Sequence, residues 1–318
     1  MEWYWIVLIV FGALFGCLAI YNVLCFVIAK GVLKSATTPK AYTLQEARDF
    51  QFEHEHLDFS VYDNVWRKED FCVQGVHGKI VGEVVYNSVV STPAKVVVIA
   101  HGHTWNRLNS IKYANIFYNL GYNIVIYDHA YFGESEGAYT TLGYYERHDL
   151  SSVLDFVRNK FGADAFVGLH GESMGAATVL LSLGLRSDID FVVADCPFSD
   201  TMKYYRQLCF QITHLPGFPI VDMSNAMSKR KFGYDFKKVS PIADVKNSNV
   251  PICFIHGKKD TFIRPSHSEK MFAVTKNPLS ELHLVEGAGH ARSHVTDNAL
   301  YAQIIANFVR KVEKSKNI

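Results

Sequence analysis

Short, uninterrupted apolar runs recur between residues 96 and 285, and segments of helical periodicity separate them. The runs are residues 96–100, 123–127, 165–169, 191–194, 251–255 and 282–285, and the helical segments are 111–120, 150–161, 176–185, 266–274 and 297–312. Strands that are apolar on both faces must be covered on both sides, as in a parallel sheet flanked by helices. The pattern therefore predicts a three-layer α/β domain whose ligands bind beyond the carboxyl ends of the strands.

Before residue 96, two regions have a different pattern of apolar and polar residues. Residues 59–62 and 79–86 alternate between apolar and polar, which is typical of half-buried antiparallel strands. Residues 31–57 are polar and mixed, and we expect a linker with one short helix there, from Thr43 to Phe50. The expected boundaries are therefore 1–30 for an apolar segment, 31–57 for the linker and 58–318 for the α/β domain.

The apolar segment carries no charge from residue 3 to residue 29. As a helix it would extend about 40 Å, at roughly 1.5 Å per residue, and a bilayer core measures about 30 Å. The residues that suit the two membrane interfaces are Trp3, Tyr4 and Trp5 at one end, and Lys30, Lys34 and Lys40 at the other. We expect a single transmembrane anchor, with the large domain on the cytoplasmic side because the lysines follow the segment.

The apolar segment has three alternatives to a transmembrane anchor. A cleaved signal peptide fits poorly, because no Lys or Arg precedes the run and the run is too long. The stretch Leu14-Phe15-Gly16-Cys17 faintly resembles a lipoprotein site, but Phe15 is wrong for one and the apolar run continues. The third alternative is a buried core helix.

Composition narrows the function classes. Hydrophobic residues make up 49% and charged residues 20% of the 318 residues, which excludes a disordered chain. With 32 Lys+Arg against 31 Asp+Glu, the net charge of +1 does not point to a nucleic-acid partner. None of the 6 Cys lies in a C-x-x-C pair, so we expect buried reduced thiols rather than a zinc or redox site.

The sharpest motif is Gly171-Glu172-Ser173-Met174-Gly175. An expected strand ends just before it and an expected helix begins just after it. Strand, tight turn and helix form a nucleophile elbow, in which Ser173 projects from the tip of the turn. The turn needs small residues at positions 171 and 175 so that strand and helix can approach closely, and the helix N-terminus favours negative charge beside the serine.

A serine nucleophile needs a base, and the base needs an orienting carboxylate. His290 follows the last expected strand in a Gly/Ala-rich loop, and Asp260 follows the strand at 251–255. Asp195, at the end of the strand at 191–194, is the rival acid. The order Ser173, Asp260, His290 matches the nucleophile–acid–base order of one fold family, and we favour Asp260.

An acyl-transfer site also needs two N–H donors for the oxyanion. One should be the backbone amide of Met174, the residue after the nucleophile. The other should come from the loop His101-Gly102-His103-Thr104, and we expect it to be the amide of His103. No metal or organic cofactor is implied.

From about residue 75 to residue 312 the chain resembles α/β-hydrolases of the serine aminopeptidase-like group, which includes monoacylglycerol lipases and membrane-anchored hydrolases. The resemblance is carried by His101-Gly102, Tyr127-Asp128, Gly133-Glu134-Ser135-Glu136-Gly137, the Ser173 motif, Asp195-Cys196-Pro197-Phe198-Ser199, His256-Gly257-Lys258-Lys259-Asp260 and Gly289-His290-Ala291. It implies a mostly parallel eight-stranded sheet, the Ser173–Asp260–His290 triad and a structural role for Asp128. In this group an insertion such as residues 199–245 often forms a small helical cap, although its aromatic residues could instead pack on the sheet.

These inferences predict a serine hydrolase that cleaves a carboxylic ester or thioester of a lipid-like or acyl substrate through an acyl-enzyme. An apolar cap and a membrane anchor both favour such a substrate. A serine peptidase or aminopeptidase is the second hypothesis, and a negative subsite for a substrate amine would favour it. The third hypothesis is a non-catalytic binding module on a hydrolase fold.

Overall fold

The structure is a computed structural model, and it describes residues 2–318. Eight strands form one sheet in the order β1-β2-β4-β3-β5-β6-β7-β8. Their bounds are β1 (Arg67–Gly75), β2 (Gly78–Tyr86), β3 (Lys95–Ala100), β4 (Asn123–Tyr127), β5 (Phe166–Glu172), β6 (Phe191–Asp195), β7 (Ile252–Gly257) and β8 (Glu281–Val285). The pairs β1–β2 and β2–β4 are antiparallel, and every other neighbouring pair is parallel. The expected fold class is confirmed.

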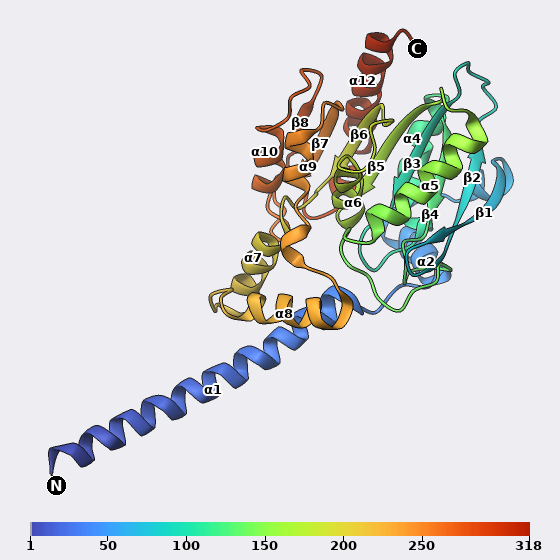
Figure 1. Cartoon of the computed structure of the whole chain (residues 1–318). Helices are drawn as coiled ribbons and strands as arrows, with labels where there is room; N and C mark the ends of the chain where they lie inside the picture. The colour runs from blue at the N-terminus through green and yellow to red at the C-terminus, as the bar shows by residue number, and fades with distance from the viewer. Residues whose placement is uncertain (1) are drawn as a thin grey trace.

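Helices precede, cover and cap this sheet (Figure 1). Their bounds are α1 (Trp3–Thr37), α2 (Leu44–Glu55), α3 (Ser60–Asn64), α4 (Ile111–Asn119), α5 (Glu146–Phe161), α6 (Met174–Ser182), α7 (Thr201–Thr213), α8 (Ile220–Phe232), α9 (Pro241–Asn247), α10 (Ser266–Phe272), α11 (Ser293–Thr296) and α12 (Asn298–Lys316), with 3₁₀ turns η1 (Arg107–Ser110) and η2 (Phe236–Lys238).

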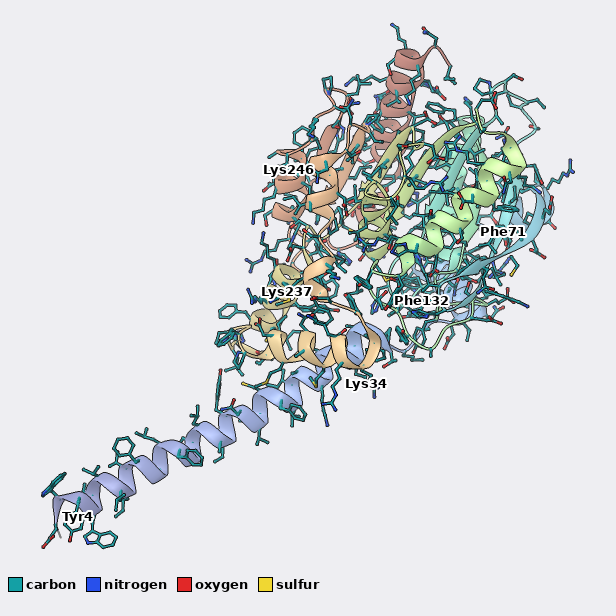
Figure 2. The ribbon with its side chains drawn as sticks, viewed as in Figure 1. Tyr4, Lys34, Phe71, Phe132, Lys237 and Lys246 are labelled. Atoms are coloured by element: carbon teal, nitrogen blue, oxygen red, sulfur yellow. The ribbon has the colours of Figure 1, made fainter. Side chains whose placement is uncertain are left out.

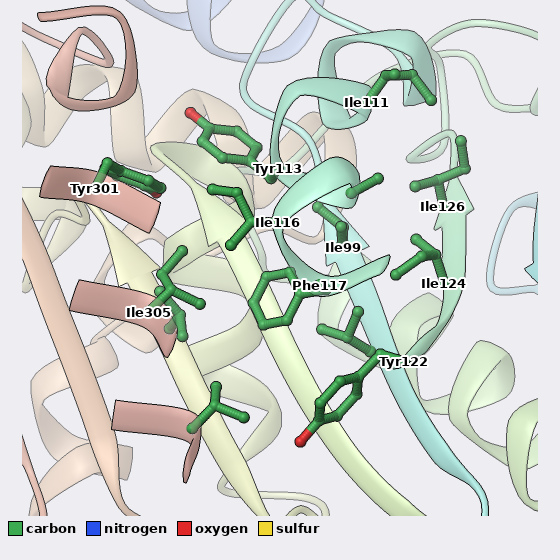
Figure 3. Packing of buried hydrophobic residues seen from close by; sticks show 14 of the residues in the cluster. Ile99, Ile111, Tyr113, Ile116, Phe117, Tyr122, Ile124, Ile126, Tyr301 and Ile305 are labelled. Carbon is green, nitrogen blue, oxygen red and sulfur yellow. The ribbon is translucent and has the colours of Figure 1, made fainter. Parts of the chain in front are cut away.

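The central strands are buried on both faces, as their continuous apolar runs require. In β3, Val97 and Ile99 belong to one hydrophobic cluster, and Val96 and Val98 belong to another. The first cluster includes side chains of α4 and α12, and its packing is seen in Figure 3. The second includes side chains of α5, α6 and α10. Strand pleating thus sends alternate residues into two separate layers.

A third hydrophobic cluster lies under the cap. It joins α7 and α8 to Met174 at the start of α6 and to the last turns of α1. Figure 1 shows α7 and α8 between the sheet and the long helix α1. The segment 199–245 therefore forms the expected helical cap, and part of its apolar surface packs against α1.

The first of the two alternating regions was predicted wrongly. Residues 60–64 form helix α3 rather than a strand, with Phe59 and Tyr62 buried in the first cluster. One strand was missed, because β1 is an edge strand whose first four residues are exposed. Charged residues are common on such edges, and they hide the apolar alternation.

Helix α1 is longer than expected and residues 31–57 are not a free linker. The helix continues past residue 30 to Thr37. Helix α2 follows, and Thr43 caps it in a capping box with Glu46. The last turns of α1 pack on the cap: Ala29 is fully buried, and its carbonyl accepts a 2.9 Å hydrogen bond from the Ser224 hydroxyl.

Most of α1 contacts nothing else in the protein. Residues 3–24 are almost entirely exposed, so the alternative of a buried core helix is wrong for them. Figure 1 shows this part projecting away from the domain, and Tyr4 lies near its far end (Figure 2). By length and composition, α1 could cross a membrane.

All six cysteines are free thiols. Cys25, Cys196, Cys209 and Cys253 are buried as expected, whereas Cys17 and Cys72 are exposed.

The packing of α1 on α8 predicts a position-specific effect of side-chain volume. Ala29→Leu forces extra methylenes into a filled contact and should lower the free energy of unfolding by about 1–3 kcal/mol. Ala13→Leu, on the exposed part of the same helix, should change it by less than about 0.5 kcal/mol. Thermal unfolding of the detergent-solubilised full chain measures both. Equal effects of the two variants would contradict the packing.

Candidate active site

Ser173 stands on a strained turn between β5 and α6. Its backbone has φ 56° and ψ −112°, a conformation that non-glycine residues rarely adopt. Side chains are excluded on both sides of it. A Cβ on Gly171 would lie 2.4 Å from the carbonyl group of Gly175, and a Cβ on Gly175 would lie 2.1 Å from the carbonyl oxygen of Ala100. The motif therefore forms the nucleophile elbow that its sequence predicts.

The three residues expected to form a triad lie in one hydrogen-bonded chain. Ser173 Oγ is 3.0 Å from His290 Nε2, and His290 Nδ1 is 2.7 Å from Asp260 Oδ2. They come from loops after β5, β8 and β7, all at the carboxyl edge of the sheet. This is the relative arrangement of nucleophile, base and orienting acid in serine hydrolases.

The environment of Asp260 keeps it ionised. Its Oδ1 accepts hydrogen bonds of 2.9 Å from the amides of both Phe262 and Ile263. Burial raises the pKa of this carboxyl, but its hydrogen bonds with His256, His290 and the Ile263 amide outweigh burial and lower the pKa to about 2. An ionised carboxylate at Nδ1 leaves Nε2 as the acceptor that faces the serine.

The rival acid Asp195 occupies a different place. Its Oδ2 accepts a 3.0 Å hydrogen bond from the Tyr301 hydroxyl, and its backbone carbonyl accepts one of 2.8 Å from the Ser173 amide. Burial raises the pKa of Asp195 to about 7, helped by the nearby Glu172 carboxylate. Asp260, and not Asp195, is therefore the carboxylate that is hydrogen-bonded to His290.

The two expected oxyanion donors border one cavity. Met174 is the first residue of α6, where amide hydrogens have no partner within the helix. His103 lies in the loop after β3, and both residues line a cavity of about 260 Å³ with Ser173. Burial lowers the pKa of the His103 side chain to about 4, so its imidazole is neutral at physiological pH. Within residues 2–318, its Nε2 finds no hydrogen-bond partner.

The loop that carries His103 is held by charges and by the chain after α1. The Asp128 carboxylate accepts a 2.7 Å hydrogen bond from the Arg107 amide and also pairs with its guanidinium, so Asp128 has the structural role expected of it. Tyr42 stacks on Trp105 with ring centroids 4.3 Å apart, and its amide donates to the Thr104 carbonyl at 2.9 Å. Sequence reasoning missed this contact, because no local pattern joins residues so distant in the chain.

A buried ion pair between Lys112 and Glu172 supports the nucleophile elbow. Lys112 Nζ lies 3.0 Å from Glu172 Oε2 and 3.0 Å from Glu55 Oε2, and Asn109 donates a 3.1 Å hydrogen bond to Glu172 Oε1. Burial opposes the charge of Glu172, but Lys112 and the Tyr113 hydroxyl lower its pKa. Glu172 directly precedes Ser173, so the network fixes the entry to the turn. Sequence reasoning missed this role, because Glu172 occupies a position of the G-x-S-x-G motif at which any residue is allowed.

The cap and α1 complete the cavity around Ser173. The lining residues are Ser35, His103, Leu142, Ser173, Met174, Phe198, Tyr204, Tyr205, Leu208, Ile212, Phe262 and Ile263. Ser35 belongs to α1, and nothing in the sequence indicated that the N-terminal helix reaches the site. The expected cap residues Tyr204, Tyr205 and Leu208 face the cavity, whereas the aromatic side chains of Phe210 and Phe218 are exposed.

The ligand atoms of Cys196, Asp260 and His290 lie within 4.8 Å of one another, which is close enough for a metal ion. A metal there would break the hydrogen bond between Asp260 and His290. Burial also raises the pKa of the Cys196 thiol, which disfavours the thiolate that binds metals. The donors therefore fit the serine–histidine–aspartate chain better than a metal site.

Comparison with known proteins shows which family the chain belongs to. The sequence model of the prolyl oligopeptidase family matches residues 115–315. The chain belongs to this family. It is also 36% identical to the protein YqkD of Bacillus subtilis (strain 168) over 224 residues, which are 69% of this chain and 72% of that one. Membership of the α/β-hydrolases, inferred from the motifs, is thereby confirmed.

Solved structures share the fold at lower identity. An esterase of Pyrococcus furiosus superposes with a TM-score of 0.65 at 21% identity, over 80% of this chain and 96% of that one. The acylaminoacyl peptidase of Pyrococcus horikoshii superposes with a TM-score of 0.57 at 15% identity, over 79% and 43%. At these identities the likeness establishes the α/β-hydrolase fold. Family and fold together make the protein a serine hydrolase.

The two aspartates give a matched test of the site. Asp260→Asn removes the carboxylate that orients His290, so labelling of Ser173 by a fluorophosphonate should slow by on the order of 10³-fold or more. Asp195→Asn removes a carboxyl of the same size that does not contact His290, and labelling should slow by less than about tenfold. Labelling rates of the two folded variants measure this. A larger effect of Asp195→Asn would reverse the assignment.

The raised pKa of Asp195 predicts a pH dependence of stability. The folded state holds a proton that the unfolded state releases above its pKa of 3.8, so stability falls as pH rises from 3.8 to about 7 and levels off above that. In Asp195→Asn the side chain stays neutral at every pH. Its Tm should therefore drop less than that of the wild type between about pH 5 and about pH 8. Identical drops would show that Asp195 ionises normally.

Proposed function

We propose that the protein is a membrane-anchored serine esterase that hydrolyses a carboxylic ester or thioester of a lipid-like or acyl substrate. Ser173 is the nucleophile, His290 the base and Asp260 the orienting acid, and the amides of Met174 and His103 bind the oxyanion. The observation that carries the proposal is the apolar cavity beside Ser173. Apart from neutral His103, no titratable side chain other than tyrosine lines it among residues 2–318.

In the first half of the reaction, His290 Nε2 takes the proton of Ser173 as Oγ attacks the substrate carbonyl carbon. The carbonyl oxygen becomes negative and accepts hydrogen bonds from the two amides. Asp260, held ionised by its own hydrogen bonds, stabilises the imidazolium. His290 then gives its proton to the departing alcohol or thiol, and the acyl group stays on Ser173.

In the second half, a water molecule gives its proton to His290 and attacks the acyl carbon. The ester bond to Ser173 Oγ breaks, Oγ regains a proton from His290, and the carboxylic acid leaves. The amides of Met174, at the N-terminus of α6, and of His103, in the loop after β3, stabilise both tetrahedral intermediates, because preorganised donors require no reorientation when charge develops.

Peptidase activity is the second candidate, and the family match favours it. The acylaminoacyl peptidase of Pyrococcus horikoshii shares the fold. An aminopeptidase, however, needs a carboxylate that pairs with the substrate amine. In the part of the chain that the structure describes, no Asp or Glu lines the cavity around Ser173, and this supports the esterase.

We propose further that α1 spans the membrane and is not a cleaved signal sequence. Its last turns belong to the folded domain, since the carbonyl of Ala29 accepts a hydrogen bond from Ser224 and that of Thr37 accepts one from the Thr140 amide. Cleavage directly after the apolar run would remove the contact of Ala29 and would cut α1 in the middle of a continuous helix. Lys30 and Lys34 at the domain end of the span favour a cytoplasmic hydrolase domain.

The first experiment compares the full chain with Ser173→Ala on p-nitrophenyl esters of rising chain length and on acylated and free aminoacyl p-nitroanilides. Ester hydrolysis should fall by at least about 10⁴-fold in Ser173→Ala, because the nucleophile is lost. Ser182→Ala is the matched control. It removes a buried serine hydroxyl at the opposite end of α6 from Ser173, where the hydroxyl donates to the Val179 carbonyl, and activity should stay within about twofold.

Other outcomes separate the hypotheses. Hydrolysis of anilides in place of esters would establish the peptidase. A folded protein that hydrolyses neither class and does not react with a fluorophosphonate would establish a binding module instead.

A further inference from the structure

A second apolar hollow adjoins the cavity at Ser173. We name it the access groove, and its volume is about 280 Å³. It is lined by Ile28, Gly31, Val32 and Ser35 of α1 and by Tyr205, Leu208, Cys209, Ile212 and Thr213 of α7. Ser35, Tyr205, Leu208 and Ile212 also line the cavity at Ser173. The two hollows therefore adjoin each other where α1 faces α7.

The groove runs along one face of α1. Ile28, Gly31, Val32 and Ser35 are spaced by three, one and three residues, so they share a face of the helix. Lys30 and Lys34 lie on the opposite face, where they line another hollow together with Arg230 and Lys231 of α8. Figure 2 shows Lys34 where α1 meets α8.

Lys30 and Lys34 indicate how deep the groove would lie in a bilayer. When α1 spans a membrane, Lys30 and Lys34 lie among the headgroups, because a charged side chain is costly in hydrocarbon. Ile28 and Gly31 are at the same level along the helix axis. The lower end of the groove therefore opens where lipid headgroups meet acyl chains, and its upper end adjoins the cavity that Ser173 lines.

The chemistry of the groove fits an acyl chain. Among the residues that the structure describes, no charged side chain lines it. Nearby cap residues expose large apolar side chains: Phe210 is 55% exposed, Ile212 70% and Phe218 68%. Such exposure is costly in water and favourable at a membrane surface. A soluble, polar substrate would gain nothing from this lining.

We propose that the access groove admits the acyl chain of a membrane-resident ester or thioester from the bilayer. The chain lies between α1 and α7, and its carbonyl group reaches Ser173 while the rest of the substrate remains at the membrane surface. This inference rests on the proposed esterase function. It gives α1 a second role, since the anchor forms one wall of the substrate path.

Gly31 offers a direct way to fill the groove. A Cβ at Gly31 meets no heavy atom within 4 Å, and leucine is a better helix former than glycine, so Gly31→Leu does not disturb α1. Its side chain occupies space that the acyl chain needs. Gly12→Leu is the matched control, because Gly12 has the same free space on the same helix but lies far from the groove.

The readout is the ratio of kcat/KM for p-nitrophenyl palmitate to that for p-nitrophenyl acetate, with the full chain in phosphatidylcholine vesicles. In Gly31→Leu the ratio should fall by about tenfold or more, which corresponds to losing the burial of about two methylene groups. Gly12→Leu should leave the ratio at the wild-type value. Only the long substrate needs the groove, so folding defects that affect both esters equally do not change the ratio.

Two results would overturn the access groove and leave the esterase standing. One is an unchanged ratio in Gly31→Leu while Ser173-dependent hydrolysis of both esters persists. The other is an equal fall in Gly12→Leu, which would make the effect a property of α1 in the bilayer. If the wild type hydrolyses neither ester and Ser173 does not react with a fluorophosphonate, the proposed function itself fails.

Discussion

The close approach of β3, β5 and α6 is the constraint on which the rest of the site depends. At Gly175 there is no room for a Cβ, because it would lie 2.1 Å from the carbonyl oxygen of Ala100. The same approach holds Ser173 at φ 56° and lifts its hydroxyl towards His290. The strain is sustained by the buried pair of Lys112 and Glu172 and by the apolar layers on both sides of the sheet. A relaxed turn would not present the hydroxyl in this way.

Hydrogen bonding decides what each buried carboxylate does. Asp260 and Asp195 are both buried beside the elbow, yet the pKa of the first is lowered to about 2 and that of the second is raised to about 7. Two backbone amides and His290 donate to Asp260. Asp195 accepts one hydrogen bond, from Tyr301, and the negative charge of Glu172 lies near it. One aspartate is therefore a permanent anion that orients a base, and the other exchanges a proton near neutral pH.

The N-terminal helix is part of the active domain as well as a projecting segment. Its last turns pack on α8, and the residues that follow it bind the loop of His103 through Tyr42 and Trp105. Ser35 places α1 in the wall of the cavity at Ser173. An anchor joined to its domain by a flexible linker would hold the enzyme near lipids. Under the proposed membrane anchoring, an anchor built into the site would also fix how the site faces the bilayer, which would matter for a substrate that cannot leave the membrane.

The sequence by itself determined the six strands β3 to β8, because a strand buried on both faces must be apolar throughout and each of the six such runs became a strand. It also predicted the elbow at Ser173, since small residues at 171 and 175 allow strand and helix to approach closely, and it placed His290 and Asp260 after strands whose ends meet along one edge. Only the tertiary structure decided between Asp260 and Asp195, because the choice depends on which carboxylate reaches His290 across the sheet. It alone showed that residues 31–37 continue α1 and that Ser35 reaches the cavity. The hydrogen bond between Ser224 and Ala29, for example, joins residues 195 positions apart, and no local periodicity encodes a contact of that kind.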